Sequence, residues 1–137
     1  MKALATLFFA IKIFQVQGQS ATDTTAVVDP NMIYDMVDVA PEPIGGMTAF
    51  YDKVGQTINY PLDARQKKIT GKVFVQFVIE KDGKLLPENM LVIRPVFKSL
   101  DEEAIRVLLL TSPWQPGVKN GKPVRTRKTF PISFKLG

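Results

Sequence analysis

The chain has 137 residues, a hydrophobic fraction of 45 % and a formal net charge of +5. This length fits one small domain. The sequence contains neither cysteine nor histidine. The lack of cysteine excludes disulfides, thiolate metal sites, a cysteine nucleophile and lipid attachment at a cysteine, and the lack of histidine removes the commonest general base and metal ligand. The composition therefore weighs against an enzyme, and we predict no cofactor and no metal site.

Residues 1–19 are typical of an export signal. Lys2 gives a positive start, and the segment from Ala3 to Phe14 is apolar apart from Lys12. This run is shorter than the roughly 20 apolar residues that a membrane-spanning helix needs. We therefore predict a signal peptide, cleaved just before Gln19, and a location in the periplasm. An uncleaved membrane anchor is the alternative.

Charge divides the remaining chain into two parts. Residues 19–43 carry five acidic side chains and no Lys or Arg, whereas in residues 44–137 sixteen basic side chains outweigh eight acidic ones. The segment 20–43 has no steady hydrophobic period, which indicates an acidic flexible linker, or a partly ordered arm lying against the domain. The folded domain is expected to occupy 44–137.

The first half of that domain predicts two helices and a strand. Phe50, Val54 and Ile58 recur at four-residue spacing, as on the apolar stripe of a helix. A short second helix is expected from about Pro61 to Lys68, because proline is tolerated at a first helical position. From Lys72 to Lys81 the hydrophobic period changes to two, with apolar residues on both faces, which is typical of a central strand.

A hairpin and a third helix follow. Asp82-Gly83 is a strong turn signal and predicts a second strand from about Leu86 to Pro95. Ser99 and Glu102 have capping-box spacing, so a helix is expected from Ser99 to about Thr111. Ser112-Pro113 would end it, because the residue before proline avoids helical geometry.

The last predicted strand runs from Val124 to Leu136 and contains Pro131. Proline has no N–H for a ladder, so such a strand belongs at an edge or a bulge. An edge strand can accept an extended peptide as an extra strand. Basic residues gather around it at 119, 122, 125, 127 and 128. We interpret them as protection of the edge rather than a nucleic-acid site, because no base-stacking aromatic residues alternate with them.

The order and spacing of these features resemble the C-terminal domain of TonB, over about 90 residues. The resemblance implies an α+β fold with a three-stranded antiparallel sheet and helices packed on one face. The segments that carry it are Gly45-Gly46, Tyr60-Pro61-Leu62-Asp63-Ala64-Arg65, Ile69-Thr70-Gly71-Lys72-Val73-Phe74-Val75, Asp82-Gly83-Lys84, Leu100-Asp101-Glu102-Glu103-Ala104-Ile105-Arg106, Trp114-Gln115-Pro116-Gly117, Asn120-Gly121-Lys122-Pro123-Val124 and Pro131-Ile132-Ser133-Phe134-Lys135-Leu136.

The resemblance also implies a function: binding of the TonB box, a short peptide of outer-membrane transporters, by addition to the last strand during TonB-dependent transport. The peptide-binding residues implied are Asn59, Tyr60, Val124, Arg125, Thr126, Arg127, Lys128, Thr129 and Phe130. Contact with the inner-membrane motor would need a membrane anchor, whereas this chain has no histidine for that contact and no long Pro/Lys-rich spacer. The alternative is a self-associating interaction domain, with Phe74 and Val78 helping to bury a homodimer interface.

Overall fold

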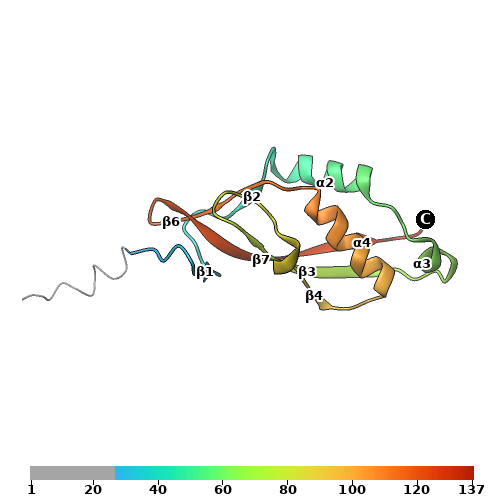
Figure 1. The fold of residues 1–137 in the computed structure, drawn as a ribbon. Coiled ribbons are helices and arrows are strands. Elements are labelled where there is room, and N and C mark those ends of the chain that lie inside the picture. The colour runs from blue at the N-terminus through green and yellow to red at the C-terminus, as the bar shows by residue number, and fades with distance from the viewer. Residues whose placement is uncertain (1–26) are drawn as a thin grey trace, which may run out of the picture.

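The computed structural model describes residues 27–137, so the predicted signal peptide lies outside the described residues. Within that range no helix is long and apolar enough to cross a membrane. The helices and strands follow one another from an extended N-terminal arm to a long final strand (Figure 1). In chain order they are β1 (Ile33–Tyr34), β2 (Glu42–Pro43), α2 (Gly46–Thr57), α3 (Leu62–Gln66), β3 (Gly71–Ile79), the 3-10 helix η2 (Pro87–Asn89), β4 (Leu91–Arg94), α4 (Lys98–Leu109), β5 (Trp114–Gln115), β6 (Gly117–Lys119) and β7 (Lys122–Phe134).

The sheet is larger than predicted and mixed. Strand β3 pairs in antiparallel with both β4 and β7, as expected. However, β1 adds to β7 in parallel, giving the order β1-β7-β3-β4, and β6 pairs with β7 in a hairpin. A separate pair joins β2 to β5. The prediction of a three-stranded antiparallel sheet is therefore wrong, because the sheet has more strands and is mixed. The added strands are two or three residues long, too short to show a hydrophobic period in the sequence.

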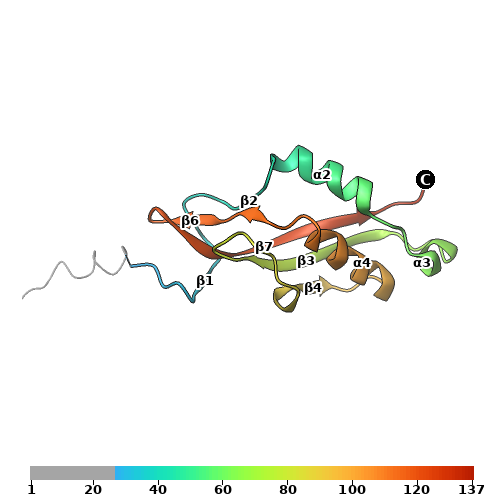
Figure 2. The ribbon, with the colours of Figure 1, turned by 45° about the horizontal axis from the view of Figure 1, so that its top comes forward.

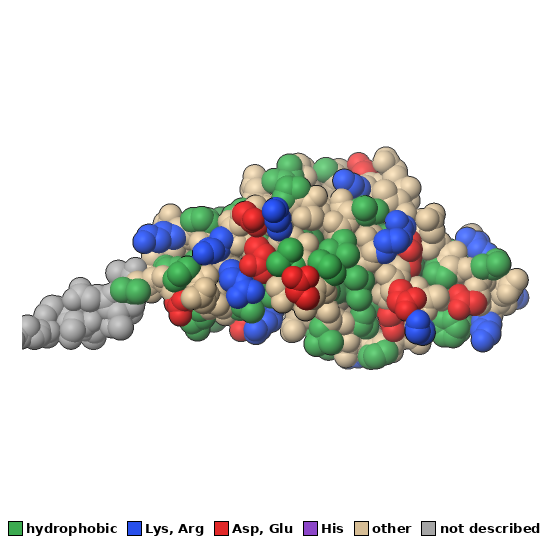
Figure 3. Space-filling view, in the orientation of Figure 1, with side chains coloured by type: hydrophobic (Ala, Val, Ile, Leu, Met, Phe, Trp, Pro, Cys, Tyr) green, Lys and Arg blue, Asp and Glu red, His purple; other side chains and the backbone are tan. Residues whose placement is uncertain are grey.

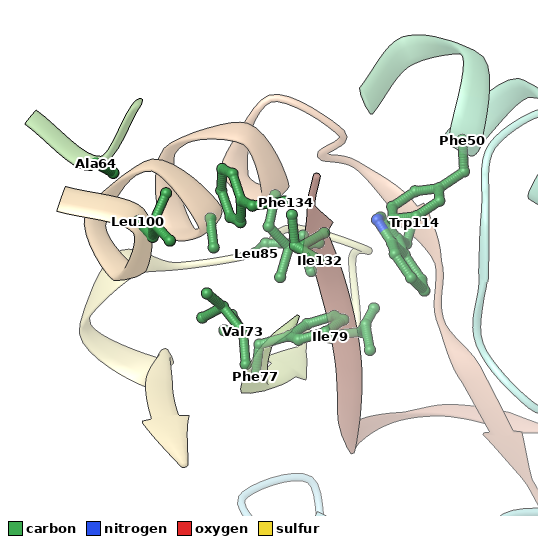
Figure 4. Packing of buried hydrophobic residues seen from close by; sticks show 13 residues of the cluster. Phe50, Ala64, Val73, Phe77, Ile79, Leu85, Leu100, Trp114, Ile132 and Phe134 are labelled. Atoms are coloured by element: carbon green, nitrogen blue, oxygen red, sulfur yellow. The ribbon is translucent and has the colours of Figure 1, made fainter. Parts of the chain in front are cut away.

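The core lies between the sheet and the helices, which cover one face of it (Figure 1). Odd-numbered residues of β3 and even-numbered residues of β7 point to this covered face, as their predicted alternation requires. Trp114 anchors the core, with its ring edge-on to those of Phe50 at 5.7 Å and Phe77 at 5.4 Å (Figure 4). Its indole N–H donates to the Thr111 hydroxyl at 2.9 Å, so the polar group of this buried ring is satisfied.

Two local predictions were wrong in detail. The second strand begins at Leu91 rather than Leu86, because the segment after Leu86 forms the 3-10 helix η2, with Pro87 at its first position. Ser99 lies inside α4 and does not cap it, because its hydroxyl donates to Asp63 at 2.7 Å and ties the helix to α3.

The predicted turn at Asp82-Gly83 is present and touches the core. Gly83 donates its N–H to the Glu80 carbonyl at 2.8 Å, and its own carbonyl accepts the N–H of Trp114 at 2.8 Å. The φ of Gly83 is +89°, in the region that favours glycine. A Cβ at this position would overlap the carbonyl oxygen of Trp114. The turn therefore requires glycine for its backbone angle and also for space.

Gly83→Ala is expected to destabilise the protein more than Gly121→Ala. Gly121 also has a positive φ, +77°, but a Cβ there would meet nothing within 4 Å. We expect about 1 kcal/mol lost at Gly121 from backbone strain, and a further 1–3 kcal/mol at Gly83 from overlap with Trp114. Urea unfolding of both variants measures the difference, and equal losses would contradict the close contact.

Candidate functional site

The outer edge of β7, opposite β3, is covered for only part of its length. On the inner edge β3 pairs with β7 over nine consecutive residues, from Ile79↔Thr126 to Gly71↔Phe134. On the outer edge β1 pairs only with Arg125 and Thr126. Within residues 27–137, no strand pairs with the outer edge from Arg127 to Phe134. This open stretch of β7, residues 127–134, is the candidate site.

The register indicates which backbone groups the open stretch exposes. In an antiparallel ladder, alternate residues direct their N–H and C=O groups to opposite edges. The two-residue turn Asn120-Gly121 makes Lys119 and Lys122 the closing pair of the β6–β7 hairpin. The backbone N–H and C=O groups of the even-numbered residues of β7 therefore point toward β6 and β3. Pro123 and Pro131 are odd-numbered, so their lack of an N–H removes no hydrogen bond from the β6–β7 and β3–β7 ladders. The N–H donors left for the outer edge of the open stretch are those of Arg127, Thr129 and Ser133.

A groove between α2 and β7 lies beside this edge. It has a volume of about 360 Å³, and α2 runs along β7 on the side away from β3 and β4 (Figure 2). Phe130 packs against two of the residues that line it, with its ring edge-on to Phe50 at 5.0 Å and stacked on Tyr51 at 6.3 Å. The groove is mainly apolar. Its lining residues are Phe50, Tyr51, Val54, Gly55, Ile58, Lys72, Pro131, Ile132 and Ser133.

An ion pair on α4 holds the end of α2 in place. Arg106 donates to the Thr57 carbonyl at 2.8 Å and to both carboxylate oxygens of Glu103 at 2.7 Å. Glu103 also accepts the backbone N–H of Asn59 at 2.6 Å. The hydrogen bond from Arg106 lowers the pKa of Glu103, assisted by the Asn59 N–H and opposed by partial burial. The pair thus fixes the end of α2, which forms one wall of the groove, relative to α4.

The predicted site residues do not form one cluster. Arg127, Lys128, Thr129 and Phe130 lie on the open stretch, and among them Thr129 is the exposed one. The side chains of Val124 and Thr126 are buried, and by the alternation their backbone groups face β6 and β3. Arg125 pairs with Ile33 of β1.

Asn59 and Tyr60 lie near the far end of β7. The ring of Tyr60 meets that of Phe134 at 5.7 Å, and its hydroxyl donates to the Ile69 carbonyl. Analysis of the sequence missed Ser133 and the α2 side of the groove. The four-residue spacing of Val54 and Ile58 marked them as apolar, but a helical stripe does not show which part of it stays accessible.

The N-terminal arm covers the other end of β7. Within the segment 20–43, the short strands β1 and β2 lie at Ile33–Tyr34 and Glu42–Pro43. Asp35 lies 3.1 Å from Arg127, and Asp38 accepts the N–H of Asn120 at 2.8 Å. The acidic and basic halves of the sequence therefore meet here, where acidic and basic side chains lie next to one another around β1 and β6 (Figure 3).

Glu80, which follows β3, has structural partners. Glu80 accepts from Arg125 at 2.9 Å and from the Asn89 side chain at 3.1 Å, which ties β3, η2 and β7 together. Within residues 27–137, no three Asp or Glu side chains gather as a metal site would require. The surface suited to a ligand is thus a strand edge with an apolar groove.

Comparison with known proteins identifies relatives of this fold. A family profile described as Gram-negative bacterial TonB protein C-terminal matches residues 56–136, more than half of the chain. The solution structure of a shorter fragment of the Helicobacter pylori TonB C-terminal domain is similar, with a TM-score of 0.50 and 21 % identity over 64 % of this chain and 90 % of that one. For a longer fragment of that domain the TM-score is 0.49 at 19 % identity, over 66 % of this chain and 79 % of that one. A search of curated protein sequences finds no match.

Glu103→Gln is expected to lower the free energy of unfolding by about 1–2 kcal/mol at pH 7, since it weakens charge-assisted hydrogen bonds to Arg106 and Asn59. Because folding lowers the pKa of Glu103, its contribution is present above the unfolded value of about 4.3 and is lost as the pH falls below it. The difference between wild type and variant should therefore shrink between pH 7 and pH 3, as measured by urea unfolding. Glu102→Gln, at an exposed ion pair of the same helix, is the control and should cost less.

Proposed function

Because the chain belongs to the family of Gram-negative bacterial TonB protein C-terminal domains, we propose that it binds an extended peptide, the TonB box of an outer-membrane transporter, by adding it as a strand to β7. The family is one of non-catalytic protein-interaction domains with a role in transport across the cell envelope. The observation that carries the proposal is the open stretch of β7, residues 127–134.

An added strand would find both backbone partners and side-chain contacts there. Outward N–H groups at Arg127, Thr129 and Ser133 supply main-chain hydrogen bonds, which give affinity for any extended segment. Alternate side chains of that segment would point into the groove beside α2 or over the opposite face of the sheet. Arg127, Lys128 and Lys72 line this region, so an acidic or polar peptide is favoured over a basic one.

The setting of this binding is also part of the proposal. The exported, periplasmic location predicted from residues 1–19 would bring the domain to the periplasmic side of outer-membrane receptors. Transfer of force from the inner-membrane motor would require an uncleaved anchor at that terminus. We propose the peptide-binding step and leave energy transduction conditional on that anchor.

Thr129→Pro is expected to weaken binding of a TonB-box-like peptide about tenfold or more. Proline removes an outward N–H, and its ring would meet the incoming strand. The fold should survive, because Pro131 already occupies an equivalent outward position. Titration of the labelled chain, followed by backbone amide shifts along β7, measures the affinity.

Thr129→Ala is the matched control, because it removes the exposed side chain but keeps the backbone donor. Its affinity should lie within about twofold of wild type. Equal affinity of Thr129→Pro and Thr129→Ala would reject this edge as the docking strand. Amide shifts that avoid residues 127–134 would do the same.

A second copy of the chain is the other candidate partner. Leu91 and Ile93 are 59 % and 48 % exposed, and they lie on β4, which forms the opposite edge of the sheet. Two such edges can pair in a homodimer. Sedimentation of the protein with and without peptide separates the two. A dimer that peptide does not dissociate would favour self-association, whereas a monomer that shifts on titration would favour the receptor peptide.

A further inference from the structure

Within the N-terminal arm, residues 29–39, the short strand β1 occupies the outer edge of β7 directly next to the open stretch. Ile33 and Tyr34 pair in parallel with Arg125 and Thr126. The pairing stops where the open stretch begins, at Arg127. The arm is therefore an extended segment of this chain that already binds the edge in the way proposed for a partner.

Polar contacts fix the arm in its register. Arg127 Nη1 lies 3.1 Å from both carboxylate oxygens of Asp35. Arg125 donates to the Asn31 carbonyl at 3.1 Å. Asp38 and Val39 donate their N–H groups to the Val118 carbonyl at 2.9 and 3.0 Å. An acidic, extended segment thus matches the basic hairpin of β6 and β7 in charge as well as in backbone pairing.

These contacts hold the arm only weakly. In the Asp35–Arg127 pair the two side chains are 64 % and 38 % exposed, and such exposed pairs contribute little. Met36 is 82 % exposed, so its side chain buries little apolar surface against the domain. By contrast, Pro41 and Pro43 are buried, and β2 pairs with β5. The arm is therefore held weakly along residues 29–39, whereas the chain just beyond it is anchored firmly.

We infer that residues 29–39 are an internal ligand of β7, which an acidic extended peptide must displace in order to bind past Arg127 toward Arg125. This inference rests on the proposed function, because it concerns the occupancy of the same strand edge. A weak segment competes well when it is tethered close by, since a short linker raises its effective concentration to the millimolar range. The apparent affinity of a partner is reduced by the fraction of molecules in which the arm is bound.

The first experiment uses a synthetic peptide with the sequence of residues 29–39, added to the full chain at low ionic strength. Asp35→Lys weakens the tethered copy, so the free peptide should bind this variant about two- to fivefold more tightly than wild type. Amide shifts at residues 125–127 report the binding. Glu102→Lys is the control, because it makes the same charge change at a carboxylate of similar exposure on α4, and it should bind like wild type.

Equal affinity of the arm peptide for wild type and Asp35→Lys, or the absence of shifts in both, would overturn the internal-ligand inference. A parallel titration with a TonB-box-like peptide separates this inference from the proposed function. Tighter binding to Asp35→Lys than to wild type and Glu102→Lys would support both. Equal binding of the TonB-box-like peptide to wild type and both variants would reject competition by the arm, while the receptor peptide would remain a partner. If the arm peptide binds and the TonB-box-like peptide does not, the internal-ligand inference stands and the proposed receptor peptide is rejected.

Discussion

The ladder between β3 and β7 is the interaction on which the rest of this structure depends. Nine consecutive residue pairs join strands that lie more than forty residues apart in the chain. Their shared face supplies much of the core, including Val73, Phe77 and Ile132. A one-residue slip would turn every one of these side chains to the opposite face, so burial of the core specifies the register. The same register decides which backbone groups of β7 remain for a partner.

The candidate site follows from what this ladder leaves unpaired. β7 is longer than the segments that cover its outer edge, because β1 pairs with only two of its residues. Long unpaired edges invite uncontrolled association, and charged side chains and prolines limit it. Arg127, Lys128 and Pro131 serve this purpose on the open stretch. The features that protect the edge also restrict which peptides it accepts, since charge favours acidic partners and Pro131 offers no N–H to a strand added at the open edge.

The arm adds a second constraint to the same edge. Its acidic side chains come from a part of the sequence without Lys or Arg. Asp35 contacts the Arg127 side chain and Asp38 accepts the backbone N–H of Asn120, in both cases more than eighty residues away. Such exposed pairs add little to stability, but they select one partner and one orientation. The arrangement suits a segment that can be exchanged, whereas a permanent part of the core would bury more apolar surface. The buried prolines just beyond the arm keep it close when it leaves.

The sequence by itself determined the elements that have a strong local pattern. Alternation predicted the faces of β3 and β7, four-residue spacing predicted α2, and Asp82-Gly83 predicted the turn, since each depends on backbone geometry over a few residues. Pro131 predicted an edge strand, whereas β7 lies between β1 and β3 and only its residues 127–134 have an unpaired outer edge. The order of these motifs also identified the family, which the profile match confirms. Only the tertiary structure decided that Ser99 binds Asp63, that β1 and β6 join the sheet, and that the opening lies at residues 127–134. These features depend on contacts between distant segments, and two-residue strands and exposed ion pairs have no periodic signal in the sequence.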